Sequence, residues 1–73
     1  MDYKAWAQEY YDTIEQIDAV LNKLKSEQAA LKRKGRKNPG INKRIIYWRG
    51  IRKECAETAD SLMMWYRRLL HEN

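Results

Sequence analysis

A single interruption, between Gly35 and Gly40, divides this 73-residue sequence into two long segments with helical periodicity. Gly35 suits the left-handed residue that follows a helix. Asn38 followed by Pro39 suits an N-cap and the first helical position of a second helix. We therefore expect helices at about 3–34 and 39–71, joined by a basic turn at 35–38.

Apolar residues recur every seven positions in both segments, which predicts one buried stripe along each helix. The first segment contains the rows Tyr3, Tyr10, Ile17, Leu24 and Leu31, and Ala7, Ile14 and Leu21, the second row being broken by Gln28. The second segment contains the rows Ile41, Trp48, Cys55, Leu62 and Leu69, and Ile45, Ala59 and Tyr66, with Arg52 as the polar exception. A turn this short makes the two helices antiparallel neighbours, so the stripes face each other. The predicted fold is an all-α, antiparallel two-helix hairpin that forms a single domain over residues 1–73.

Gly50 lies in the middle of the second segment, where glycine costs about 1 kcal/mol relative to alanine. Three explanations are open at this stage. The glycine marks a close approach by another helix, a kink, or a second helix that begins later than Pro39.

Several large apolar residues lie outside the two stripes, and a hairpin alone leaves them in water. Ile46, Met63 and Leu70 are expected to point away from the row that contains Trp48 and Leu62. The residues that we assign to a protein interface are Trp6, Tyr11, Ile46, Met63, Met64, Trp65 and Leu70. Exposed apolar patches usually mark an interface. We expect a homodimer that forms a four-helix bundle, with an unidentified protein partner as the alternative.

The net charge of +5 is strongly segregated along the chain. Residues 23–53 carry twelve basic residues against Glu27 alone, and the hairpin gathers this block at its turn. Such a tip is typical of phosphate binding, and the candidate nucleic-acid-binding residues are Lys32, Arg33, Lys34, Arg36, Lys37, Lys43, Arg44 and Tyr47. No nucleic-acid recognition motif is present, so sequence-specific readout is not expected. The alternative is a solvated basic loop on a protein-directed adaptor or inhibitor.

The sequence does not predict an enzyme, a cofactor or a small-molecule substrate. Nucleophilic catalysis needs a nucleophile, a base and an orienting group together, and the only histidine, His71, lies near the chain end. Cys55 falls on a core row, where cysteine usually acts as a small apolar residue. One cysteine and one histidine cannot build a tetrahedral zinc site, so no metal is expected either.

No stretch of the sequence approaches the ~20 apolar residues that cross a bilayer, so membrane association is not predicted. The first residues, Met1-Asp2-Tyr3-Lys4, lack the basic start and the apolar core of a signal peptide. A single cysteine excludes an intrachain disulfide. We expect a cytoplasmic protein.

Overall fold

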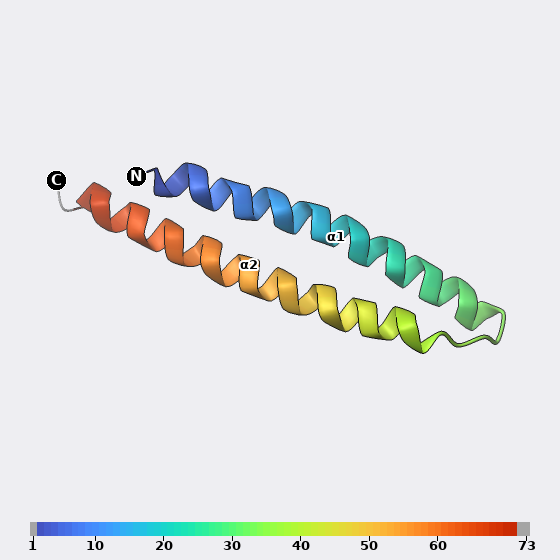
Figure 1. Cartoon of the computed structure of the whole chain (residues 1–73). Helices are drawn as coiled ribbons and strands as arrows, with labels where there is room; N and C mark the ends of the chain where they lie inside the picture. Colours follow the sequence, from blue (N-terminus) through green and yellow to red (C-terminus); the bar gives the residue numbers. More distant parts are fainter. Residues whose placement is uncertain (1, 72–73) are drawn as a thin grey trace.

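The computed structural model describes residues 2–71, and in this part the chain forms two helices, α1 (Tyr3–Arg33) and α2 (Pro39–His71). The helices lie side by side and antiparallel in a rod that measures 61 × 15 × 15 Å (Figure 1). The first turn of α1 and the last turn of α2 lie at one end of the rod, and the turn between the helices lies at the other. Residues 2–71 contain no strand, so the predicted all-helical hairpin is confirmed.

The turn is closed by hydrogen bonds at the end of α1. Gly35 adopts a left-handed conformation, with φ of +69°. Its N–H donates to the Lys32 carbonyl at 3.0 Å, and the Arg36 N–H donates to the Leu31 carbonyl at 2.9 Å. These two bonds satisfy carbonyl groups that the end of a helix leaves unpaired. Lys34 takes the cap position, so α1 ends one residue earlier than predicted.

Side-chain caps begin both helices. The Asp2 carboxylate accepts a hydrogen bond from the Ala5 N–H at 3.0 Å. The Asn38 side-chain oxygen accepts one from the Gly40 N–H at 3.0 Å, with Pro39 at the first helical position. Each cap satisfies a backbone donor that has no partner within its helix, which is why the helices begin at these residues.

The buried core comes entirely from the predicted stripes. Its members are Ala7, Ile17, Leu21, Leu24, Ile41, Ile45, Ala59 and Leu62. Leu31, Trp48 and Cys55 are only partly buried, because no third helix covers them. The prediction for Leu69 is wrong, since 46% of this residue is exposed. It lies near the end of the rod where no turn holds the helices together.

Gly50 lies within one continuous helix, because α2 runs unbroken from Pro39 to His71. A Cβ atom built at Gly50 meets no atom within 4 Å. A later start of α2 is therefore wrong, and no other helix of residues 2–71 approaches Gly50 closely.

Polar contacts join the two helices along one flank, which we call the clasped flank. They are Lys4–Tyr66, Tyr11–Asp60, Asp18–Arg52 and Gln28–Asn42. Arg52 Nε donates a hydrogen bond to Asp18 Oδ1 at 2.6 Å, and the pair is also an ion pair. Gln28 and Arg52, which interrupt the apolar rows, thus find partners on the opposite helix. Lys4, Tyr11 and Asp18 recur every seven positions, and the same spacing continues to Lys25 and Lys32. The clasped flank therefore continues to the turn.

These contacts set the protonation of the groups involved. The hydrogen bond from Arg52, followed by its charge, lowers the pKa of the Asp18 carboxyl. The Asp18 carboxylate in turn raises the pKa of the Arg52 guanidinium. Partial removal from water, together with the nearby Asp60 carboxylate, raises the pKa of the Tyr11 phenol. All three groups therefore keep their ordinary neutral-pH forms: an ionised carboxyl, a charged guanidinium and a neutral phenol.

Candidate nucleic-acid interface

Seven basic residues lie between Lys32 and Arg44, and the turn gathers them at one end of the rod. Lys32 and Arg33 belong to the last turn of α1, while Lys43 and Arg44 lie in the first two turns of α2. All seven are exposed, and none of them forms an ion pair within residues 2–71. The end of the rod is therefore a strongly positive surface whose charges are not neutralised by the protein.

A hollow of about 600 Å³ opens at this end, and we call it the tip hollow. It lies between the last turns of α1 and the first turn of α2, on the clasped flank. Its lining residues are Lys25, Gln28, Ala29, Leu31, Lys32, Arg36, Lys37, Asn38, Pro39, Ile41 and Asn42. Four of them are basic and none is acidic, so the hollow favours an anion.

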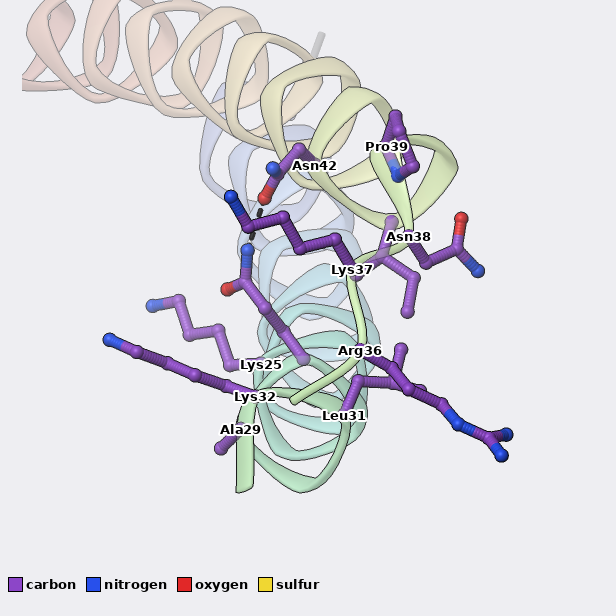
Figure 2. Close-up of a pocket in the computed structure, with 11 residues that line it drawn as sticks. Lys25, Ala29, Leu31, Lys32, Arg36, Lys37, Asn38, Pro39 and Asn42 are labelled. Atoms are coloured by element: carbon purple, nitrogen blue, oxygen red, sulfur yellow. Dashed lines mark hydrogen bonds between the residues drawn. The ribbon is translucent and has the colours of Figure 1, made fainter. Parts of the chain in front are cut away.

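The basic side chains around the tip hollow do not all extend in the same direction. Lys25, Lys32 and Lys37 extend to the side on which Asn42 lies, whereas Arg36 extends to the opposite side (Figure 2). The Asn42 side-chain oxygen accepts a hydrogen bond from the Gln28 amide beside these lysines. Three ammonium groups therefore border the same mouth of the hollow.

This arrangement suits phosphate more than a planar carboxylate. An ammonium group acts as a compact point charge with three donors, and it binds phosphate without demanding one approach direction. Ile41 is buried and Leu31 is half-buried behind the lysines, so the floor of the hollow is apolar. A sugar or the face of a base can lie on such a floor while a phosphate meets the lysines.

The predicted nucleic-acid-binding residues are spread over two surfaces. Lys32, Arg36 and Lys37 line the tip hollow. Arg44 and Tyr47 line a second hollow of about 550 Å³, the flank hollow, whose other lining residues are Val20, Lys23, Leu24, Glu27 and Trp48. Arg33 and Lys34 are exposed at the end of α1, and Lys43 lines neither hollow. The cations therefore surround the tip, and the two hollows open on different flanks.

Tyr47 is the aromatic residue that we expected to stack on bases. Its ring meets that of Trp48 edge-to-face, with centroids 5.3 Å apart, and 60% of the residue remains exposed. It is accessible, but it lies beside the flank hollow and not in the tip hollow. A strand held at the tip reaches Tyr47 only by passing around the side of the rod.

Three residues of the tip hollow are absent from the predicted set: Lys25, Gln28 and Asn42. Lys25 precedes Lys32 by seven residues, so the heptad spacing could have indicated that both occupy one row. Gln28 could have been noticed because it is a polar residue in an otherwise apolar row. Asn42 carried none, because its role depends on the opposite helix.

The predicted protein-interface residues are mostly exposed. The exposed fraction is largest for Ile46, at 69%, and Leu70, at 58%, and Trp6, Met64 and Trp65 are also exposed. Met63 is half-buried, so it offers less surface to a partner than the other residues of this set. Tyr11 is exposed, but its hydroxyl is already engaged with Asp60, at 3.3 Å.

Residues 2–71 contain no group of three or more side chains that could hold a metal ion. Cys55 packs against the core cluster around Ile17 and Leu21. Neither helix, as far as the chain is described, is long and apolar enough to span a membrane. Comparisons with protein-family models, with curated proteins and with solved structures find no match to this chain.

Proposed function

We propose that this chain is a non-enzymatic binding module whose basic tip engages the phosphate backbone of nucleic acid without reading its sequence. The observation that supports this proposal is the set of uncompensated cations around the tip hollow. A surface that served only to keep a loop solvated would not need three lysines on the same side of a hollow with an apolar floor. The proposed setting is the cytoplasm, where a single free cysteine stays reduced.

The proposed binding depends on the release of counterions. Each phosphate that a lysine or arginine neutralises frees part of the ion atmosphere of the nucleic acid, so affinity falls as salt rises. For a single strand the slope of log K against log salt is about −0.7 per contact. Three lysines at the tip hollow therefore account for a slope of about −2.

The test compares two variants with the same change in net charge. One replaces the tip lysines (Lys25→Gln, Lys32→Gln and Lys37→Gln). The control replaces cations far from the tip (Lys4→Gln, Lys53→Gln and Arg67→Gln). Fluorescence anisotropy with a generic single-stranded DNA and a generic RNA, between 50 and 200 mM salt, measures the slope.

The tip variant is expected to lose about 2 from the magnitude of the slope, while the control keeps the slope of the original chain. Equal losses in the two variants would show that net charge, and not the tip, governs binding. An original chain that binds neither nucleic acid at 50 mM salt contradicts the proposal as a whole.

A second proposed property is self-association, and the exposed area of the chain favours it. A compact protein of 8.8 kDa exposes about 4,800 Å². This chain exposes 6074 Å². The excess of roughly 1,300 Å² is larger than the ~800 Å² that each partner buries in a standard stable interface. A homodimer that forms a four-helix bundle would bury such an excess. The alternative is a different protein that binds the same apolar residues. A monomeric mass in solution would favour this alternative.

A further inference from the structure

The two flanks of the hairpin differ in how they are closed. The cross-helix hydrogen bonds between side chains in residues 2–71 all lie on the clasped flank. The opposite flank, which we call the open flank, consists of one row from each helix, and the residues of each row are spaced seven positions apart. Its rows are Trp6, Thr13, Val20 and Glu27 on α1, and Arg44, Ile51, Thr58 and Trp65 on α2. Apolar surface on this flank is therefore not covered by contacts between the helices, although the Arg68 guanidinium lies over the Trp65 ring, 5.3 Å from its centroid.

The open flank carries two apolar regions of different shape. Towards the turn lies the flank hollow, which Val20, Leu24, Tyr47 and Trp48 line, with the charged residues Lys23, Glu27 and Arg44 at its edge. Towards the chain ends lie Trp6 and Trp65, which are 41% and 48% exposed. The register in which Tyr11 meets Asp60 and Asp18 meets Arg52 places these two tryptophans at the same level of the rod. Projecting rings thus occupy one half of the flank, and a hollow occupies the other half.

Small polar residues separate the two regions. Thr13 and Thr58 lie between them, and each hydroxyl donates to a carbonyl of its own helix at 2.9 Å. These side chains are short and have satisfied their hydrogen-bonding groups, so another helix can approach closely there. A two-fold axis perpendicular to the rod at the level of Thr13 and Thr58 places the tryptophans of one copy against the flank hollow of a second copy. The open flank is therefore complementary to itself, as a two-fold symmetric contact requires.

The charge distribution selects the same orientation. Residues 1–22 have a net charge of −4 and residues 54–73 of −2, whereas residues 23–53 have +11. The hairpin turns this pattern into a rod that is negative in the half with the chain ends and positive in the half with the turn. Two parallel rods would set like poles side by side, and two antiparallel rods set opposite poles together.

We propose that two copies of this chain pair through the open flank with their rods antiparallel. Trp6 and Trp65 of each copy then fill the flank hollow of the other copy, and the basic residues nearest the middle of each rod lie beside the acidic half of the other copy. This inference rests on the proposed self-association and specifies its surface and its direction. It also places the two basic tips at opposite ends of the pair, so that each remains open to nucleic acid.

The first test uses the original chain and measures the dimer dissociation constant by sedimentation, without nucleic acid, at 0.01 and 0.15 M salt. The screening length shrinks from ~30 Å to ~8 Å over this range. For antiparallel rods the attraction weakens, and the dissociation constant is expected to rise by roughly tenfold. A constant that falls with added salt indicates like poles in contact and overturns the proposal. A monomer mass at high concentration and low salt overturns it as well.

The second test maps direction by cross-linking. Lys23→Cys and Arg68→Cys are prepared separately, each with Cys55→Ala so that one thiol remains. In the antiparallel pair position 23 of one copy lies near position 68 of the other. Identical positions lie about 20 residues apart along the rod, which is about 30 Å at 1.5 Å per residue. A short bismaleimide is therefore expected to link the mixture and neither variant alone.

Strong self-links in the separate variants would show a parallel pair and overturn the proposal. The same dimer mass with Trp6→Ala and Trp65→Ala combined would place the interface elsewhere, with the same consequence. None of these measurements involves nucleic acid. A failure of the antiparallel pair is therefore distinguishable from a failure of the basic tip, which the anisotropy series reports by itself.

Discussion

Replacing Gly50 with alanine is expected to stabilise the hairpin. The residue is exposed in the middle of a continuous helix, and an added Cβ meets no atom within 4 Å. Alanine therefore gains about 1 kcal/mol in helix propensity without a steric cost. The entropy of unfolding is about 2.1 cal/mol/K per residue, or roughly 0.15 kcal/mol/K for this chain. The Tm should consequently rise by about 6–7 °C.

The matched control is the same substitution at Gly35, where the opposite sign is expected. Gly35 has φ of +69°, which disfavours any residue that carries a Cβ. Alanine in this left-handed conformation costs roughly 1–2 kcal/mol, so the Tm should fall by about 7–13 °C. Space is not the reason, because a Cβ at Gly35 also meets nothing within 4 Å. The two variants thus separate the effect of backbone conformation from the effect of packing.

Thermal unfolding followed by circular dichroism at 222 nm, at one fixed protein concentration, measures both values. Fixed concentration matters because self-association would raise the apparent Tm. A Gly50→Ala protein whose Tm falls would refute the reasoning. It would mean that another chain packs closely against this side of α2, or that the helix needs to bend there.

Three further predictions concern contacts between the helices. Asp18→Asn should reduce the loss of stability in acid. The lowered pKa of Asp18 means that its ionised carboxylate stabilises the fold above pH 3.8, and this stabilisation is lost as the pH falls below that value. Urea midpoints at pH 6 and pH 3 measure the loss, and an equal loss in the original chain and the variant contradicts the prediction. Tyr11→Phe should reduce the loss of stability in alkali. The raised pKa of Tyr11 means that its neutral phenol stabilises the fold below pH 10.0, and this stabilisation is lost as the pH rises through the folded-state pKa. Urea midpoints of the variant that fall between pH 9 and pH 11 as much as those of the original chain contradict the prediction. Leu24→Ala should cost about 2–3 kcal/mol at a buried site, while Leu70→Ala, at a site that is 58% exposed, should cost less than about 0.5 kcal/mol in the monomer; similar urea midpoints for the two variants would contradict the assigned core.

Local signals accounted for the helices and the turn. A cap residue, a proline at the first helical position and a left-handed glycine each act within a few residues of chain, so they can be recognised in the sequence. The heptad rows named every member of the buried core. The error at Leu69 has a different origin. Its row is correct, but burial at the end of a two-helix rod depends on how far the opposite helix covers it.

The candidate site was predicted only in part. The basic residues are concentrated in residues 23–53, on both sides of the turn, so a hairpin must bring them together at one end of the rod. The tip hollow depends on Lys25 and Asn42, which are distant in sequence and line the same hollow from opposite helices. The division of the predicted residues between two hollows also depends on which flank each row faces.

By itself the sequence determined that this chain forms two helices, where they meet and which residues they bury. These properties follow from capping and periodicity, which act along one helix at a time. Only the tertiary structure decided that one flank is clasped by polar contacts while the other leaves its tryptophans exposed. That distinction depends on how each helix is rotated about its own axis and on the register between them, and both are set by the packing of the two stripes against each other.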